Sequence, residues 1–403
     1  MKSGSNNFLD GKDIVIVTLS EWDGPRRIRH HLANELAKEG DRVLFIEGFY
    51  TISKFLKKPN LSKFFRFLSR PREISRNLFI VSVIPFLPFG EFSSLVSWIN
   101  WSAARFFIKR AMKELGFKKC VLFIFAYNAD SLIGRMDEQI SVYFCNDAFD
   151  KLYNRESLRH KVAALEQQLI QKADAVITVS EKLTEERSPF AKSIATVHHG
   201  VDYQLFEDVL VSGPAPEDIS KIRRPVIGYS GVVRHIIDLD LLQYVAARHP
   251  EWSVVVVGPV TESDKRYYDK VEVLKKMANV HFLGPKPSDE IPRYINQFDV
   301  CMLPYTLEEV STYYAAPLKF YEYLAAGKPV VSTVGPKEMD DGIVINAVTR
   351  ETFLSGVEKA LTMTSAELIR KRKEAAKLNS WSERVNSIAE FLSGVNMKMS
   401  QEL

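Results

Sequence analysis

Short apolar runs alternate along this chain with longer amphipathic stretches. Ile14 to Leu19 is an almost unbroken apolar and β-branched run, as expected of a parallel strand buried on both faces. A loop with Gly24 follows, then a helical pattern from His30 to Glu39 that Gly40 ends, and then a second apolar run from Arg42 to Ile46. This strand, loop, helix and strand order predicts the start of a doubly wound parallel sheet.

The same alternation continues in two series. Further strands of the first series are expected at 78–84, 121–125, 142–145 and 175–179, with a helix at 157–172. A polar stretch with two prolines, Ser212 to Asp218, separates the series. Strands of the second series are expected at 226–229, 252–257, 280–283, 300–303 and 329–333, with a helix over 238–248. We therefore predict an α/β protein of two Rossmann-like domains that face a cleft, with ligands beyond the carboxyl ends of the strands.

Composition agrees with a globular protein and excludes several other classes. The 403 residues exceed one domain at roughly 150 residues each. With 46% hydrophobic and 26% charged residues, disordered and fibrous proteins are excluded, and a net charge of +4 excludes a globally basic nucleic-acid binder. Cys120, Cys145 and Cys301 are far apart, which is typical of a reducing compartment. No apolar run is long enough to span a membrane and residues 1–13 hold no signal core, so we expect a cytoplasmic protein.

The segment Ala316 to Val331 carries the most specific chemistry. A loop leads into a short helix that begins near Leu318 and ends at Gly327, and a strand follows. Lys319 and Glu322 are three residues apart, so they share one helix face close to the helix N-terminus. Free N–H groups there suit phosphates, a lysine can neutralise a diphosphate, and a carboxylate can accept hydrogen bonds from a ribose diol.

This segment resembles the donor-nucleotide motif of GT-B glycosyltransferases, in the broad group around glycosyltransferase family 4, also called group 1. Three other segments resemble that group in the same order. They are a last N-domain strand at 173–180, a hinge at 198–202 and the nucleobase-side strands and turns at 254–258 and 280–284. The resemblance implies an acceptor-binding domain at 1–205, a nucleotide-sugar-binding domain at 222–378 and a C-terminal helix at 379–403 that packs back on the first domain.

The implied activity is transfer of a hexosyl group from a nucleotide sugar to a hydroxyl. A UDP-sugar is favoured as donor and a GDP-sugar stays open, while the acceptor would be a surface polysaccharide or a lipid-linked glycan. The implied donor-binding residues are Gly231, Gly258, Gly284, Leu318, Lys319 and Glu322. Arg234 is a further candidate for the donor diphosphate because it closely follows Gly231, and the alternative for it is an exposed loop cation. No cofactor beyond the nucleotide-sugar co-substrate, no metal and no nucleic-acid partner is expected, because no Asp-x-Asp pair is placed to hold a cation.

Two departures from the family pattern leave other functions open. The Arg and Lys that usually bind the donor diphosphate in this group are not at their common spacing in this sequence. Tyr314 stands where the group usually has a second glutamate. The loop from Gly228 to His235 instead resembles a subgroup that builds bacterial cell-surface polysaccharides, including teichuronic acid-type enzymes. The alternatives are a nucleotide-sugar epimerase of GT-B architecture, and a catalytically degenerate glycosyltransferase that acts as an assembly partner.

Two loops of the first domain hold further candidates. Asp147 follows the strand at 142–145, and the family resemblance implies a catalytic base there, with Asp150 as the substitute and a turn or helix cap as the plain alternative. Gly24, Arg26 and Arg27 lie in the first loop after a strand, where glycine and arginine suit a phosphate. The alternative for these arginines is an ordinary solvated loop.

Residues 54–76 are strongly basic and partly aromatic. Leu61, Phe64, Phe65 and Leu68 fall at helical spacing, which predicts an amphipathic helix. A basic helix with an aromatic face suits an anionic membrane, so this stretch would hold the protein at the inner face of the cell membrane. The alternative is a helix that packs on its own domain.

Overall fold

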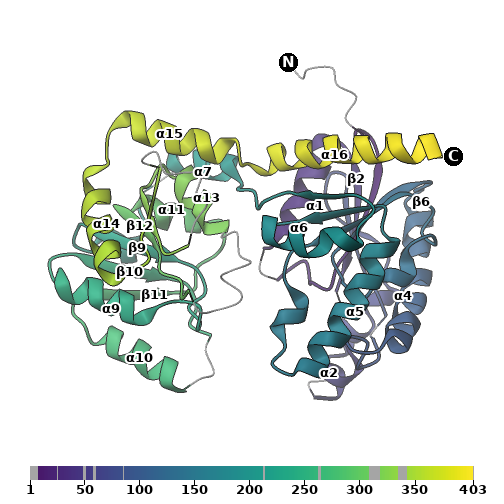
Figure 1. Ribbon diagram of the computed structural model, residues 1–403, viewed down its shortest axis with the longest axis horizontal. Coiled ribbons are helices and arrows are strands. Elements are labelled where there is room, and N and C mark those ends of the chain that lie inside the picture. Colours follow the sequence, from purple (N-terminus) through teal and green to yellow (C-terminus); the bar gives the residue numbers. More distant parts are fainter. Residues whose placement is uncertain are drawn as a thin grey trace. The chain divides into compact units, whose positions relative to one another are not determined.

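The computed structural model describes residues 8–24, 26–48, 51–57, 60–84, 86–211, 214–261, 265–307, 318–334 and 343–402. The chain divides into two compact units, one of residues 1–198 and 384–403 and one of residues 199–383 (Figure 1). Tyr314 and Pro317 lie outside the described residues.

The first unit is built on a sheet with β1 at its centre. Its strands are β1 (Asp13–Val17), β2 (Arg42–Glu47), β3 (Arg72–Ser75), β4 (Leu78–Ser82), β5 (Cys120–Ile124), β6 (Glu138–Cys145), β7 (Ala175–Thr178) and β8 (Ile194–Thr196). They lie in the order β3-β4-β2-β1-β5-β6-β7-β8, and β3 runs antiparallel to β4 while the other pairs are parallel. The chain winds outward from β1 in both directions, which confirms the predicted doubly wound sheet.

Helices cover this sheet and connect its strands. They are α1 (Ile28–Glu39), α2 (Ile52–Lys57), α3 (Leu61–Phe64), α4 (Ser94–Glu114), α5 (Glu156–Lys172), α6 (Glu181–Arg187) and α16 (Trp381–Glu402), with the short 3-10 helices η1 (Arg66–Leu68), η2 (Asp130–Leu132), η3 (Phe149–Leu152) and η4 (Ser188–Phe190). Gly40 ends α1 in the left-handed region at φ 112°, as its sequence predicts. Residues 384–402 of α16 belong to this first unit, and Gln139 Nε2 donates to Asn396 Oδ1 at 3.4 Å.

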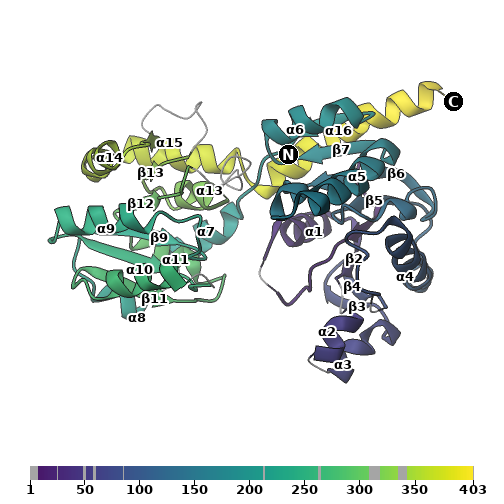
Figure 2. The ribbon, with the colours of Figure 1, turned by 60° about the horizontal axis from the view of Figure 1, so that its bottom comes forward.

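The amphipathic helix predicted within residues 54–76 is wrong as a continuous element. The stretch instead forms α2, the single turn α3, η1 and the edge strand β3. Figure 2 shows α2, α3 and β3 near one another. Arg66 donates from Nη1 to the buried carboxylate of Glu47 at 3.1 Å, and Phe67 packs edge-on against Phe107 of α4 with ring centroids 5.0 Å apart. These contacts turn the segment onto its own unit before a second helical turn can form.

The second unit is built on a fully parallel sheet. Its strands are β9 (Val226–Ser230), β10 (Ser253–Val257), β11 (Val280–Gly284), β12 (Val300–Leu303), β13 (Val330–Ser332) and β14 (Val344–Asn346), in the order β11-β10-β9-β12-β13-β14. Its helices are α7 (Tyr203–Val211), α8 (Glu217–Ser220), α9 (Leu239–Arg248), α10 (Lys265–Lys275), α11 (Ile291–Asn296), α13 (Leu318–Ala325), α14 (Arg350–Thr362) and α15 (Ala366–Lys377). α9 contacts both α10 and α14, while α7, α11, α13 and α15 pack among themselves, so two helix layers enclose the sheet.

The second unit begins at His199, ahead of the polar stretch that the sequence suggests as a linker. Val201 and Phe206 are 1% and 3% exposed and belong to the hydrophobic core of the second unit. The Val201 amide donates to the Asn379 carbonyl at 3.0 Å, which joins this segment to the end of α15. Burial of these two apolar side chains therefore sets the division at 198/199, in place of the expected 205.

The helices of the structure can be compared with the length and apolar character that a membrane span requires. Among the helices of the described residues, none combines the length and the apolar character needed to cross a membrane.

Asp41 gives this fold a testable pH dependence. The side chain is 2% exposed at the start of β2, and burial raises the pKa of its carboxyl to about 7 although the Lys12 amide donates to it at 3.1 Å. Between the unfolded pKa near 4 and this folded pKa, the folded protein holds a proton that the unfolded chain has lost. The carboxyl therefore lowers the free energy of unfolding as the pH rises through that window, by at most about 1.4 kcal/mol per pH unit.

Asp41→Asn should remove this loss. We expect the stability of the variant relative to wild type to rise from pH 4 to pH 7 and to level off above, measured by urea denaturation at each pH. Asp269→Asn, an exposed aspartate, serves as the matched control. A difference between Asp41→Asn and wild type that does not change with pH would contradict the assignment.

Candidate functional site

Three glycines lie side by side where β9, β10 and β11 end. The Gly231 amide donates to the Val257 carbonyl and the Gly258 amide donates to the Gly284 carbonyl, both at 2.8 Å. All three glycines have positive φ, and a Cβ on Gly258 would lie 2.1 Å from the Gly231 carbonyl oxygen. Since a side chain at Gly258 would block this approach and positive φ favours glycine at all three positions, the glycines leave bare backbone at the carboxyl edge of the sheet.

Helix α13 brings Lys319 and Glu322 to this edge. The Tyr323 hydroxyl accepts a hydrogen bond from the Ser230 amide at 2.9 Å, which ties α13 to the end of β9. A Cβ on Gly231 would lie 1.9 Å from Lys319 Cε, so the lysine side chain crosses directly over Gly231. The structure therefore brings Gly231, Gly258, Gly284 and Lys319 together.

Glu322 is half-buried on the same helix. Burial raises the pKa of its carboxyl, and the Lys319 charge opposes that shift by favouring the ionised form. Within the part of the chain that the structure describes, no donor bonds this carboxylate. Its oxygens can therefore accept hydrogen bonds from a ligand.

The two other predicted donor residues border this group. Leu318 is the half-buried first residue of α13. Arg234 has an exposed side chain in the loop between β9 and α9, and its carbonyl accepts hydrogen bonds from the Tyr267 hydroxyl and the Ile237 amide.

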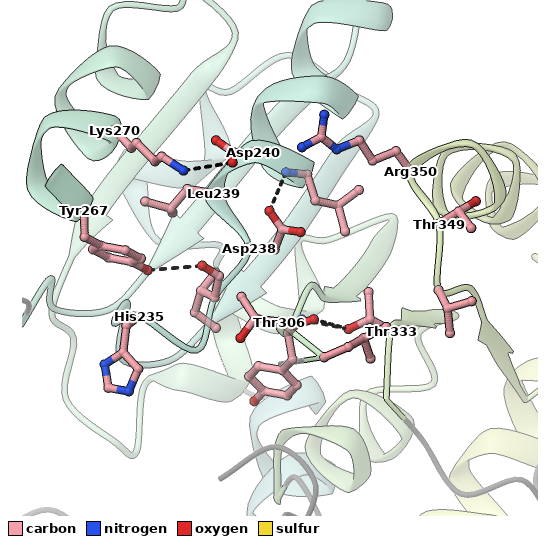
Figure 3. Close-up of a pocket in the computed structure, with 15 residues that line it drawn as sticks. His235, Asp238, Leu239, Asp240, Tyr267, Lys270, Thr306, Thr333, Thr349 and Arg350 are labelled. Atoms are coloured by element: carbon pink, nitrogen blue, oxygen red, sulfur yellow. Dashed lines mark hydrogen bonds and ion pairs between the residues drawn. The ribbon is translucent and has the colours of Figure 1, made fainter. Parts of the chain in front are cut away.

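A cavity of about 400 Å³ adjoins the same loop (Figure 3). It lies at the N-termini of α9 and α14 and is lined by His235, the residue after Arg234, but by none of the predicted donor residues. Asp238 caps α9 by accepting from the Leu241 amide at 2.9 Å, and Asp240 pairs with Lys270 at 2.8 Å. Because these polar groups already bond within the protein, we assign no ligand to this cavity.

The first loop of the other unit is held in shape by His30. Its Nδ1 accepts from the Arg27 amide at 3.1 Å and its Nε2 lies 3.2 Å from the Glu21 carbonyl. Burial lowers the pKa of His30 to about 4, so the ring is neutral and Nε2 carries the proton. Gly24 is half-buried, and the exposed Arg26 and Arg27 follow it, with the Arg26 guanidinium 4.8 Å from the Trp22 ring centroid.

A cavity of about 360 Å³ lies in this first unit. It is lined mainly by apolar groups, among them Leu19, Phe86 and Phe89, together with Glu91 and Asn128. Leu19 belongs to the loop after β1, so the cavity adjoins the carboxyl edge of the first sheet.

The two carboxylates proposed as base are in different environments. Asp147 is half-buried and follows β6 after one intervening residue, and its Oδ1 accepts from the Ala148 amide at 2.9 Å. Asp150 is 8% exposed and forms an ion pair with Arg187 at 3.0 Å. Arg187 also bonds the buried carboxylate of Glu166 at 3.0 Å, so Asp150 is committed to a structural ion cluster.

This cluster is invisible in the sequence, because its members come from η3, α5 and α6. The Glu166 carboxylate also accepts from the Tyr143 hydroxyl at 2.7 Å and the Cys145 thiol at 3.3 Å, and burial raises the pKa of its carboxyl. The cluster lies next to Asp147 in the chain and fixes the loop that carries it.

The histidines of the predicted hinge make contacts within the protein. His198 bonds the Val179 carbonyl through Nδ1 and lies 3.0 Å from Glu181 through Nε2. Among the residues with described positions, no group of three His, Cys, Asp or Glu side chains is arranged to hold a metal ion.

Comparison with known proteins adds family information. Residues 224–363 match the family model described as glycosyl transferases group 1. The chain is 29% identical over 261 residues to TuaH of Bacillus subtilis (strain 168), whose name assigns it to teichuronic acid biosynthesis as a glycosyltransferase. That match covers 60% of this chain and 63% of TuaH, so it spans less than two thirds of the relative.

Solved structures share the fold over almost the whole chain. An E. coli structure named for trehalose-6-phosphate and bound with UDP-2-fluoro glucose has a TM-score of 0.66 at 12% identity, covering 95% of this chain and 99% of that one. Anabaena HepE in complex with UDP gives 0.62 at 16% identity, with 95% and 100% covered. The catalytic domain of Arabidopsis thaliana starch synthase IV, bound to ADP and acarbose, gives 0.64 at 11% identity, with 96% and 100% covered. The predicted GT-B fold is confirmed.

Proposed function

From the match of residues 224–363 to the model of the group 1 glycosyltransferases, we propose that the protein transfers a sugar from a nucleotide-sugar donor to a glycan hydroxyl. The donor is a UDP-sugar, with a GDP-sugar as the alternative, and the acceptor is a surface polysaccharide or a lipid-linked glycan. One observation carries the proposal. Lys319 lies over Gly231 at a bare sheet edge, beside a Glu322 carboxylate that no described donor bonds. The teichuronic acid name of the relative TuaH supports the acceptor class.

The donor is held by charge and by exposed backbone. Gly231 and Gly258 let the diphosphate approach the main chain closely, and the ammonium of Lys319 and the guanidinium of Arg234 neutralise it. The Glu322 carboxylate accepts hydrogen bonds from the ribose diol. When the bond between the sugar and the diphosphate breaks, the same cations stabilise the leaving group, so the proposed reaction needs no metal ion.

The acceptor is activated in the first unit. As the acceptor oxygen attacks the anomeric carbon, its proton passes to the carboxylate of Asp147 and the nucleoside diphosphate leaves. Asp147 suits this role better than Asp150, because Asp150 is paired with Arg187. The apolar cavity beside Leu19 is our proposed acceptor pocket.

A surface of the first unit suits a membrane-bound acceptor. We define the α4 surface as Leu95, Trp98, Ile99 and Phe106, which lie on one helix face and are 40–68% exposed. The contact of Phe67 with Phe107 connects the α4 surface to the basic stretch. The side chains of Leu61, Phe65 and Leu68 in that stretch are each at least 50% exposed. Exposed apolar side chains gathered in this way indicate an interaction site.

Cations border this apolar surface. Arg105, Lys109, Arg110 and Lys113 of α4 and Arg135 line a groove that also contains Phe106, and Asp137 is its acidic residue. Apolar and aromatic side chains beside a cluster of cations match the interface of an anionic bilayer. We propose that this surface, in place of a single helix at 54–76, holds the protein at the cytoplasmic face of the membrane.

Glu322→Ala should weaken donor binding. Loss of two charge-assisted hydrogen bonds should weaken the nucleotide at least tenfold, measured by calorimetric titration with UDP, GDP, CDP and TDP. Glu367→Ala, an exposed glutamate of α15, is the matched control. If no nucleotide binds wild type, the assignment of the donor site is wrong, and the hypothesis of a catalytically degenerate assembly partner is supported.

Asp147→Asn should stop transfer and leave the donor affinity unchanged. We expect the rate of nucleoside diphosphate release, in the presence of a total membrane lipid extract, to fall by about 10²–10⁴. If wild type releases the nucleotide without the lipid extract, the epimerase alternative is supported instead. A rate within threefold of wild type for Asp147→Asn would exclude Asp147 as the base.

Trp98→Ser combined with Phe106→Asp should weaken membrane binding at least tenfold, because two exposed aromatic side chains no longer insert. The assay is co-flotation with vesicles of phosphatidylglycerol and phosphatidylcholine. Leu378→Asp, an exposed leucine of the other unit, serves as control. Equal flotation of the double variant and wild type would contradict the assignment.

A further inference from the structure

Arg29 is a buried cation without a counter-charge. The residue lies in the first turn of α1 and is 8% exposed. Its Nη1 donates to Thr18 Oγ1 at 3.1 Å, and its Nε is buried without a hydrogen-bond partner. Within the described ranges no carboxylate lies within ion-pair distance of this guanidinium, although most other buried charges of this unit are paired.

Such an arrangement costs stability in the ligand-free protein. An unpaired charge that leaves water loses its hydration, and burial together with the nearby Arg27 charge lowers the pKa of Arg29 to about 10. The aromatic face of Phe125, 5.7 Å from the guanidinium, replaces only part of that hydration. A buried cation of this kind is expected where a ligand supplies the missing negative charge.

The surroundings of Arg29 are suited to an anion. Thr18 follows β1 and Phe125 follows the neighbouring β5, so the guanidinium lies at the carboxyl edge of the sheet centre. Thr18 Oγ1 already accepts from Arg29 and from the Ser20 amide at 3.1 Å, which leaves its own proton to donate. The first turn of α1 adds N–H groups without intrahelical partners.

A ligand can reach the Arg29 guanidinium at Nη2. Nη2 makes no hydrogen bond within the described residues and is not among the fully buried polar atoms. The proposed acceptor pocket is lined by Leu19, the residue directly after Thr18. An anionic group in that pocket could therefore be bound from the Thr18 side.

We propose that Arg29, Thr18 and the N-terminus of α1 bind an oxyanion group, a carboxylate or a phosphate, that the acceptor carries. The anion site stands on the geometry of the first unit, whereas its assignment to the acceptor rests on the proposed function. The acceptor is therefore an acidic glycan or a phosphate-linked one, and a neutral sugar lacks the group that Arg29 binds.

The experiment compares Arg29→Met with wild type in four titrations. The probes are inorganic phosphate, glucuronate, neutral glucose and UDP, at one ionic strength kept constant with chloride, and binding is followed by calorimetry and by the melting temperature. Arg370→Met removes one exposed arginine of α15 and controls for net charge. Thr18→Val is a second variant that keeps the cation and removes the hydroxyl donor.

We expect phosphate or glucuronate to bind wild type and Arg370→Met saturably, and at least tenfold more weakly to Arg29→Met and Thr18→Val. Glucose should show no such binding, and UDP affinity should be the same in all four proteins. The melting temperature of ligand-free Arg29→Met should equal or exceed that of wild type, since an unpaired buried charge is removed.

Three results would overturn the proposal. If wild type binds neither phosphate nor glucuronate, the anion site does not exist. If Arg29→Met binds both anions as tightly as wild type does, the site lies elsewhere. If Arg29→Met loses UDP affinity as well, the group that it binds belongs to the donor and the acceptor assignment fails. If UDP does not bind wild type but the anions still bind in an Arg29-dependent way, the proposed function is rejected and the anion site stands.

Discussion

Close backbone packing at the carboxyl edge of the second sheet determines the arrangement of its candidate site. The amides of Gly231 and Gly258 each donate to the last residue of the neighbouring strand at 2.8 Å, and no Cβ fits at either position. This packing leaves room for Lys319 to cross Gly231. The hydrogen bond from Ser230 to Tyr323 then sets where α13 lies, and with it the position of Glu322.

Two buried arginines of the first unit, Arg187 and Arg29, have different surroundings. Arg187 is surrounded by Glu166 and Asp150, and the Tyr143 hydroxyl and Cys145 thiol complete the hydrogen bonds of the Glu166 carboxylate. A cluster whose buried charges are paired in this way is a structural element, and it supports the loop that carries Asp147. Arg29, by contrast, has a hydroxyl and an aromatic ring but no anion among the described residues. The same residue type therefore serves the fold in one place and a ligand in the other.

The basic stretch shows how helical spacing can mislead. Leu61, Phe65 and Leu68 are spaced as on one helix face, yet the chain makes one helical turn and then a 3-10 turn. The bond from Arg66 to the buried Glu47 and the packing of Phe67 on Phe107 outweigh the local pattern. Three apolar side chains remain exposed beside those of α4, so the apolar character that suggested a membrane surface persists in a different backbone.

The sequence by itself determined the strands, the two doubly wound sheets, the helix end at Gly40 and the presence of Lys319 and Glu322 on one short helix. These features depend on residues close together in the chain, where periodicity and glycine positions carry the information. Only the tertiary structure decided which charges have partners. Asp150 and Arg187 are paired, while Arg29 has no carboxylate partner among the residues that the structure describes, because ion pairing depends on side chains that distant segments bring to the same sheet edge. Burial then makes the difference large, since an unpaired charge is costly only where water is excluded.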